Sequence, residues 1–439
     1  EPAVGEPNSR LTPAARLPRR SSMHWLRSML LTALVCVSAT TPARAEDWPQ
    51  WLGPRRDNSS TEKVTPWKDQ LKVLWRKPVG EGHSSPVVAA GRVFIHAKIK
   101  DKNEEEIVAF DAKSGEEQWR TRYERDAFTS FYGNGPRATP AVVEGRLYAF
   151  GITGVLTCLE TATGKQVWQV DTLKQFKAKN LFFGMACSPL VAGERVLVNI
   201  GGKGTSVVAF DRMKGEVAWK SMDDPASYSS PIVFGEGAGR QVVFLTGANV
   251  ASLNPADGSV FWRYPLVDKL LESSTTPARA GDLLLASSIT YGSVGLKLET
   301  KDGKPAAEKA WMKKELTSYF STPVAVGAEH IYMVTGTTPS PLAKPSADLH
   351  CIEAKTGREL WKKAKVGTYH ASLTRTGDDK LLLLTDRGEL ALLEPDPKEY
   401  HELARSKVSG PQTWAHPALS GGRLYIRDKE ELICLQMTP

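Results

Sequence analysis

Cysteine is scarce in this chain, with five residues among 439. No two are adjacent, and none lies in a C-x-x-C or C-x-x-C-H pattern. The sequence therefore gives no support for a zinc site, a covalently attached haem or a vicinal disulfide. An H-E-x-x-H motif is also missing, and the glycine-rich run at residues 201–204 lacks the spacing of a phosphate-binding loop. The sequence thus supports none of these particular catalytic or cofactor sites.

A strong excess of one charge is missing as well. The formal net charge is +8, and residues 1–45 hold six Arg and two Glu, so the remaining residues carry +8 − 4 = +4. A balance this even leaves no global basic surface for nucleic acid. The hydrophobic content of 41% and the charged content of 24% are typical of a globular protein.

Long apolar runs are limited to one, at residues 29–37. It follows Met23 and the basic Arg27, and it precedes the Ala-Arg-Ala sequence that ends at Ala45. This order is typical of a secretory signal peptide, and the run is too short to span a bilayer as a helix. We predict that residues 1–45 are a disordered N-terminal extension and signal peptide, cleaved after Ala45. The mature protein would be periplasmic or secreted, with no integral membrane segment.

Helical periodicity is absent, and an internal repeat takes its place. Each unit begins with a Ser/Thr-Pro pair and contains four short, alternating apolar stretches separated by glycine turns. The units start 42 to 54 residues apart, at Pro86, Pro140, Pro189, Pro231, Pro277, Pro323 and Pro417, with Ser372 in the seventh place. Four strands per unit of this length predict an all-β fold, an eight-bladed β-propeller of four-stranded antiparallel blades.

The two ends of the repeat complement each other. A spare strand pattern at residues 71–76 precedes the first unit, and the last unit ends after its third strand. We predict that this N-terminal strand closes the last blade, which removes an exposed sheet edge. Residues 46–70 then form a lead-in segment, and residues 71–437 form the propeller.

A tryptophan recurs four residues after the last glycine turn of most units. One ligand could not touch every blade, so we interpret these residues as structural docking residues that fill the gaps between blades. Leu403 takes the same place in the seventh unit, and the tryptophans are Trp75, Trp119, Trp168, Trp219, Trp262, Trp311 and Trp361.

The unit [ST]-P-x-V…G-x-[LV]-[FY]…[AC]-[FL]-[DE]-x-x-[TS]-G-x-x-x-W resembles the tryptophan-docking repeat of the PQQ-type quinoprotein propellers. The resemblance covers about residues 70–437. Two groups share this repeat: the PQQ-dependent alcohol and glucose dehydrogenases, and the BamB-like group of non-catalytic eight-bladed propellers that act in outer-membrane protein assembly. The head WPQWLGPR at residues 48–55 also resembles the start of many exported bacterial proteins with PQQ-like repeats.

The predicted topology brings one residue of each unit to the mouth of a central channel. These residues lie three positions before each strand-one Pro or Ser372, and they are His83, Arg137, Ala186, Tyr228, Ser274, Phe320, Tyr369 and Trp414. Four of the eight are aromatic and none is acidic. They either form a binding surface or plug the channel by packing on each other. Our candidate binding residues are His83, Arg137, Tyr228, Phe320, Tyr369 and Trp414.

A dehydrogenase of this resemblance would need Ca²⁺ held by several oxygen ligands and a carboxylate base. Asp223, Asp224, Asp268 and Glu272 lie near the mouth but follow no ligand spacing. We therefore expect no catalytic residue, no metal and no cofactor.

The predicted function is an exported binding scaffold, similar to the BamB-like group, for a protein or peptide partner in the cell envelope. Two alternatives stay open. One is a PQQ-dependent alcohol or sugar dehydrogenase that uses PQQ and Ca²⁺. The other is a carbohydrate-binding propeller.

Overall fold

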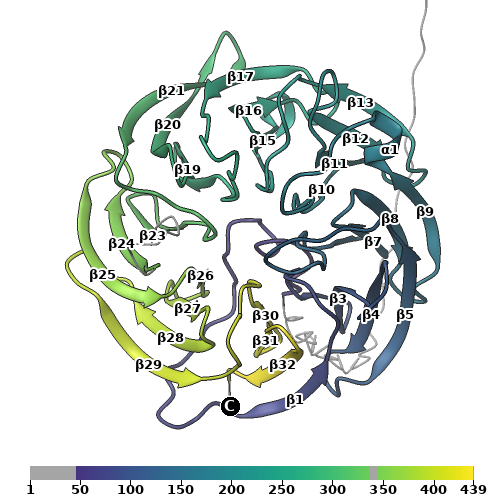
Figure 1. The fold of residues 1–439 in the computed structure, drawn as a ribbon. Coiled ribbons are helices and arrows are strands. Elements are labelled where there is room, and N and C mark those ends of the chain that lie inside the picture. Colours follow the sequence, from purple (N-terminus) through teal and green to yellow (C-terminus); the bar gives the residue numbers. More distant parts are fainter. Residues whose placement is uncertain (1–45, 337–344, 439) are drawn as a thin grey trace, which may run out of the picture. The chain divides into compact units, whose positions relative to one another are not determined.

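The computed structural model describes residues 46–336 and 345–438, so the extension and signal peptide predicted at residues 1–45 lie outside the described residues. The described part folds into eight four-stranded antiparallel sheets arranged in a ring (Figure 1). The predicted all-β, eight-bladed propeller is confirmed. The helical elements are α1 (Thr172–Phe176) and the short 3-10 turn η1 (Gly237–Gly239).

Seven blades consist of four consecutive strands each. The first three are β2–β5 (Val87–Ala89, Arg92–Lys98, Glu104–Asp111, Glu117–Glu124), β6–β9 (Ala141–Val143, Arg146–Phe150, Val155–Glu160, Gln166–Asp171) and β10–β13 (Leu190–Ala192, Arg195–Asn199, Val207–Asp211, Val217–Ser221). The next two are β14–β17 (Ile232–Phe234, Gln241–Leu245, Asn249–Leu253, Val260–Pro265) and β18–β21 (Ala278–Ala280, Leu283–Ser288, Gly292–Lys301, Lys304–Lys313). The sixth and seventh are β22–β25 (Val324–Val326, His330–Gly336, Ala347–Glu353, Glu359–Gly367) and β26–β29 (Ala371–Arg375, Leu381–Thr385, Glu389–Glu394, His401–Lys407).

The eighth blade joins the two ends of the propeller. Strands β30 (Ala418–Ser420), β31 (Arg423–Arg427) and β32 (Glu431–Gln436) are completed by β1 (Val73–Pro78), which pairs antiparallel with β32. Trp75 lies opposite Cys434, and Arg76 lies opposite Ile433. The predicted closing strand is confirmed, with bounds two residues later than expected.

The Ser/Thr of the repeated Ser/Thr-Pro pair links neighbouring blades at the innermost strands. The hydroxyl of Thr139 accepts a hydrogen bond of 3.0 Å from the backbone N–H of Ser85. The hydroxyl of Ser188 accepts one of 2.9 Å from Thr139, and Ser230 accepts one of 2.9 Å from Ser188. The chain of bonds satisfies buried N–H groups that have no ladder partner, which explains why most units have a hydroxyl there.

The recurrent tryptophans lie between blades. The indole N–H of Trp119, Trp168, Trp219, Trp311 and Trp361 donates to a backbone carbonyl in the last turn of the following blade, at 2.7–3.1 Å. The turn glycine packs flat on the ring: a Cβ atom at Gly215 would lie 2.7 Å from Trp168, and Gly115 contacts Trp75 in the same way. Glycine is therefore required both for its positive φ and for this close approach.

Trp75 and Trp262 differ from these five tryptophans. Trp75 Nε1 is buried with no hydrogen-bond partner among the described residues, and Trp262 bonds within its own blade. The hairpin of β20 and β21 in the following blade is ten residues long on each strand, so its turn at Gly303 lies away from the ring. The Trp262 N–H instead donates to Gln241 Oε1 of its own blade, at 3.2 Å. Because the longer hairpin places its turn carbonyls out of reach, the Gln241 side chain serves as the acceptor for this indole N–H.

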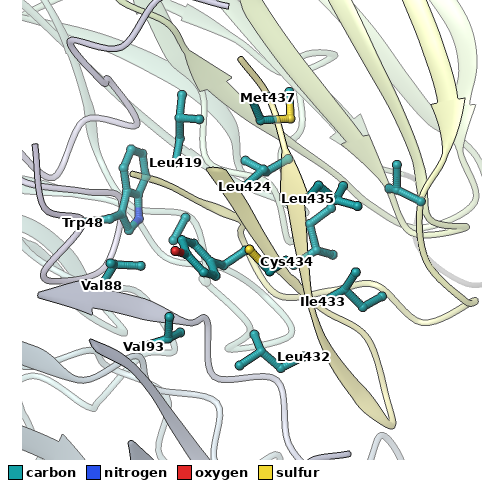
Figure 2. Close-up of a cluster of buried hydrophobic side chains, with 14 of the residues drawn as sticks. Trp48, Val88, Val93, Leu419, Leu424, Leu432, Ile433, Cys434, Leu435 and Met437 are labelled. Atoms are coloured by element: carbon teal, nitrogen blue, oxygen red, sulfur yellow. The ribbon is translucent and has the colours of Figure 1, made fainter. Parts of the chain in front are cut away.

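The lead-in segment runs through the middle of the ring before β1 begins, as the purple trace in Figure 1 shows. It enters beside the first blade, where Trp48 pairs with Val88. Trp48 is 1% exposed and packs among side chains of the first and eighth blades, including Leu419 and Leu424 (Figure 2). The segment leaves along the seventh blade, where Ser59 pairs with Arg375. The central channel is therefore occupied by the chain itself.

Candidate functional site

The mouth residues predicted from the repeat meet at one end of the inner strands. A cavity of about 160 Å³ opens there, and seven of the eight predicted positions line it: His83, Arg137, Ala186, Tyr228, Ser274, Phe320 and Trp414. Tyr369 is outside the lining, with its ring centre 6.5 Å from that of Trp414. Of the six candidate binding residues, the structure brings together all except Tyr369.

Further lining residues come from positions that the repeat did not single out as mouth residues. Tyr132, Phe183, Glu272 and Tyr319 reach in from the loops between blades. Trp51, Ser188, Ser230 and His370 also line the cavity. The loop residues Tyr132 and Phe183 stand out in the sequence as members of aromatic pairs. Trp51 belongs to the head WPQWLGPR, whose resemblance to other exported proteins does not place it at the mouth.

The aromatic rings of the mouth touch one another and still enclose a cavity. Ring centres lie 5.7 Å apart for Tyr132 and Trp414, 5.5 Å for Tyr132 and Phe183, and 5.7 Å for Phe183 and Tyr228. His83 lies 5.0 Å from Trp414. Packed rings of this kind form a rigid apolar wall, because each side chain is held by its neighbours.

Arg137 is a cation in this apolar wall. Its guanidinium donates to the carbonyl oxygens of Phe183 at 2.8 Å and Gly133 at 3.2 Å, which ties two mouth loops together. No carboxylate of the described residues lies within 4.0 Å of it. Burial lowers the pKa of Arg137 to about 10, so the group keeps its charge at neutral pH. A positive charge without a carboxylate partner thus faces the mouth.

His83 is neutral at physiological pH. Burial and the nearby charge of Arg137 lower its pKa to about 3. Its Nε2 lies 2.8 Å from the carbonyl oxygen of Tyr132, which can only accept, so Nε2 carries the proton. His83 therefore positions the Tyr132 loop and is not charged toward a ligand.

Glu272 is the one carboxylate among the residues that line the mouth cavity. It accepts a hydrogen bond from the Tyr319 hydroxyl. Burial, together with this bond, raises the pKa of Tyr319 well above its ordinary value, so the hydroxyl stays protonated. The pair is a polar contact between two mouth loops.

This donor set does not fit a calcium-held quinone. Ca²⁺ takes six to eight oxygen ligands, usually with several carboxylates. Glu272 is the one carboxylate that lines this cavity. No group of three or more His, Cys, Asp or Glu that could hold a metal occurs within residues 46–336 and 345–438. The volume of about 160 Å³ is also below the ~300 Å³ at which small-molecule sites usually begin.

The lead-in segment contributes to the mouth cavity through Trp51, which donates from its indole N–H to Thr276 Oγ1 at 2.9 Å. The edge of its ring contacts His416, with ring centres 4.8 Å apart. His416 occupies the place that Ser or Thr fills in most other units. An aromatic residue there supports the lead-in ring, so the eighth unit departs from the repeat where the lead-in crosses.

The rim of the mouth exposes apolar side chains. Among the described residues nine large hydrophobic side chains are exposed, and six of them lie in loops at this end of the blades: Phe131, Phe182, Val267, Leu270, Leu271 and Phe320. Phe131 is 86% exposed and Phe182 is 77% exposed. Each packs on a ring that lines the cavity, Tyr132 at 5.0 Å and Phe183 at 4.8 Å. Phe131 and Phe182 thus extend the aromatic wall of the cavity onto the exposed rim.

Known proteins resemble this chain in sequence. The sequence profile described as "Outer membrane protein assembly factor BamB" matches residues 59–135 and 103–363. The protein of that name from Burkholderia pseudomallei is 22% identical over 381 residues, covering 83% of this chain and 87% of the relative.

Two solved structures share the fold. The crystal structure of BamB from Moraxella catarrhalis has a TM-score of 0.57 at 14% identity, covering 84% of this chain and 98% of that one. Quinohemoprotein alcohol dehydrogenase from Comamonas testosteroni has a TM-score of 0.58 at 15% identity, covering 89% and 80%. No helix in the described part of the chain is long and apolar enough to cross a membrane.

Proposed function

Because the chain belongs to the family of the outer membrane protein assembly factor BamB, we propose that it is an exported, non-catalytic scaffold that binds protein segments during outer-membrane protein assembly. The binding surface is the mouth of the propeller, and the place of action is the periplasm. The protein would hold its partner and perform no chemistry on it.

The uneven distribution of exposed apolar side chains carries this proposal. Six of the nine such residues among the described ones lie on the mouth loops. Soluble proteins rarely leave contiguous apolar surface uncovered unless it binds something. Exposed aromatic rings around a preformed cavity are also typical of the anchoring residues at protein interfaces.

The chemistry of the mouth favours a polypeptide. Tyr132, Phe183 and Trp414 can receive an apolar or aromatic side chain at the cavity. Arg137, which has no carboxylate partner among the described residues, can donate to a peptide carbonyl or a carboxylate of the partner. An extended polypeptide segment carries an apolar side chain and a backbone carbonyl close together, so it can occupy the cavity and bond to Arg137 at the same time.

Site-specific photo-crosslinking in the native envelope tests the proposal. A photoreactive phenylalanine analogue is placed at Phe131, Phe182 or Leu271 at the mouth, and at Met213 or Val167 as exposed apolar controls on other parts of the blades. We expect the mouth positions to crosslink to outer-membrane proteins or their assembly factors. Equal crosslinking at the control positions would contradict a binding mouth.

A matched pair of variants measures the contribution of the rim. Phe131→Ser/Phe182→Ser removes the two most exposed rings, and Met213→Ser/Val167→Ser removes the same kind of surface elsewhere. We expect only the first pair to abolish co-purification of the crosslinked partner.

Two assays address the alternative functions. Purified protein given PQQ and Ca²⁺ should not reduce a dye with alcohols or sugars, and a glycan array should give no saturable signal. Positive turnover would replace the scaffold with a dehydrogenase, and saturable glycan binding would replace it with a carbohydrate-binding propeller.

A further inference from the structure

A second cavity lies on the other side of the lead-in segment from the mouth. Its volume is about 480 Å³, within the range of small-molecule sites. Its walls are lead-in residues between Gln50 and Asp57 and the inner strands β14, β18 and β22, including the turn residues Gly281 and Gly327 at the ends away from the mouth. The two cavities therefore open at opposite ends of the inner strands.

The charged lining of this cavity is strongly basic. Four arginines contribute to it, Arg55, Arg56, Arg279 and Arg375, against one acidic residue, Asp57, and no lysine. They come from the lead-in, the fifth blade and the seventh blade, so the fold collects them from distant parts of the sequence. Two of the four are ion-paired with carboxylates outside the lining, Arg55 with Glu46 and Arg375 with Asp379, whereas Arg56 and Arg279 have no carboxylate within 4.0 Å among the described residues.

The Arg56 guanidinium is buried and held in place at the bottom of the cavity. It is 1% exposed and donates to the carbonyl oxygens of Pro231 at 2.8 Å, Pro189 at 3.0 Å and Ser188 at 3.2 Å. No carboxylate in the described part of the chain lies within 4.0 Å of its guanidinium, so its charge is not neutralised. Burial lowers the pKa of Arg56 to about 10, which still leaves the group charged at neutral pH. A buried positive charge of this kind raises the potential in the adjoining cavity.

Arg279 and Arg375 keep donors available. Arg279 lies over the Phe234 ring at 4.8 Å and uses only Nε, which donates to the Gly281 carbonyl at 2.8 Å. Its two terminal nitrogens have no hydrogen-bond partner among the described residues. Arg375 forms an ion pair with Asp379 through Nη1 at 3.4 Å, and its Nε and Nη2 have no hydrogen-bond partner among the described residues. Arg55, in contrast, is already paired with Glu46 and Ser59.

We propose that this cavity binds a phosphoryl group, carried either by a small soluble molecule or by a lipid headgroup. Planar guanidinium forks match the geometry of phosphate oxygens, and several of them around one cavity favour an anion that offers more than two oxygens. Arg279 and Arg375 would contact the anion, and Arg56 would supply charge from beneath. The site is separate from the mouth, and its function does not depend on protein binding there.

Calorimetry with the mature chain tests the proposal with three probes at low salt. These are inorganic phosphate, glycerol 3-phosphate, and vesicles of phosphatidylcholine with or without phosphatidylglycerol. Saturable binding of either soluble probe indicates a soluble phosphorylated ligand. Binding only to the phosphatidylglycerol vesicles indicates a headgroup. Absence of binding to all three would overturn the proposal.

Paired variants separate the site from general charge effects. Arg279→Ala/Arg375→Ala should weaken binding at least tenfold, whereas Arg195→Ala/Arg358→Ala removes two arginines from positions outside the cavity and should leave it within twofold. Equal losses in the two pairs would show that net charge alone matters and would contradict a site.

A substitution that is expected to tighten phosphate binding rules out loss of folding as the cause of the weaker binding in the arginine variants. Asp57→Asn keeps the Oδ1 that accepts from the Ser59 N–H at 2.9 Å, but it removes the one negative charge of the lining. Binding should become several-fold tighter, and an unchanged or weaker affinity would count against the proposal. The mouth variant Phe131→Ser/Phe182→Ser should bind phosphate like the native chain, so the two proposals fail independently.

Discussion

His416 provides a sharp test of how the lead-in segment is held in the propeller. The residue is 1% exposed, and neither of its ring nitrogens has a hydrogen-bond partner in the described part of the protein. Its ring contacts Trp51 at 4.8 Å and lies 5.9 Å from His370. Burial, and to a lesser extent the neighbouring His370, lowers the pKa of His416 from 6.5 to about 3.

The sign and size of the effect on stability follow from proton linkage. Below pH 6.5 the unfolded chain binds a proton at His416 that the folded chain does not bind until pH falls to about 3. Stability is therefore complete above pH 6.5 and is lost as pH falls, by about 1.4 kcal/mol for each unit. Between pH 7.5 and pH 4.5, some two units of this window are crossed, which amounts to roughly 2–3 kcal/mol.

Urea unfolding of the native chain and of His416→Phe at both pH values measures this contribution. Phenylalanine keeps a ring against Trp51 but cannot bind a proton. Relative to the native chain, the variant should gain roughly 2–3 kcal/mol on moving from pH 7.5 to pH 4.5. Carboxylates titrate equally in both proteins, so the difference isolates His416. A control, His401→Phe at an exposed position of β29, should change by less than about 0.5 kcal/mol. Parallel pH dependence in the native chain and His416→Phe would refute the reasoning.

Three further predictions concern stability and are measured by urea unfolding at pH 7.5. Gly53→Ala should destabilise by about 1–3 kcal/mol, because φ is +81° and the new Cβ would lie 2.9 Å from the Trp48 ring; a fully native midpoint would show that the lead-in can shift. Trp168→Ala should cost about 3–5 kcal/mol and Trp168→Phe only about 1 kcal/mol, since the latter loses mainly the 3.0 Å bond to the Arg212 carbonyl; equal losses would assign the effect to the bond and not to the ring. Arg56→Met should cost at least about 2 kcal/mol, because it leaves buried carbonyls unpaired; a more stable variant would mean that desolvation of the charge outweighs those bonds.

The repeat made the blades predictable from the sequence. Each unit carries the same turn glycines and the same alternation, so every blade is decided by local patterns that occur several times over. The closing strand was predictable for the same reason, since a spare fourth strand at one end complements a missing one at the other. Its bounds, Val73–Pro78 against the predicted 71–76, shifted because short strand ends depend on pairing with β32.

The mouth residues were predictable by position, whereas the cavity was not. A fixed offset from each strand-one proline places seven of eight residues in the lining. Tyr369 is absent from the lining and packs beside Trp414. Glu272 and Tyr319 come from loops of unequal length, and loop length is the feature that varies between units.

The lead-in segment was the least predictable of the described parts of the chain. Many of its contacts join residues far apart in the sequence, such as Arg56 and Pro189, which are 133 positions apart, and Trp51 and Thr276, which are 225 positions apart. No periodicity encodes such contacts, because the segment occurs once in the chain. Leu52, Arg56 and Asn58 adopt positive φ values of 55–60°, an unusual conformation for three non-glycine residues so close together. Two kinds of contact hold this backbone: hydrogen bonds within the segment, such as that from the Asn58 N–H to the Leu52 carbonyl at 2.9 Å, and contacts with the surrounding blades.

The lead-in segment in the central channel lines both cavities of the propeller. The lead-in fills the axis, where Trp51 lines one cavity and Arg55 and Arg56 line the other. One segment therefore supplies an aromatic surface at the mouth and a basic surface at the opposite end. Since both surfaces depend on the same few residues, a perturbation such as Gly53→Ala should weaken protein binding at the mouth and phosphate binding at the opposite cavity together. Substitutions in the blades, such as those at Phe131 or Arg279, should affect one end only.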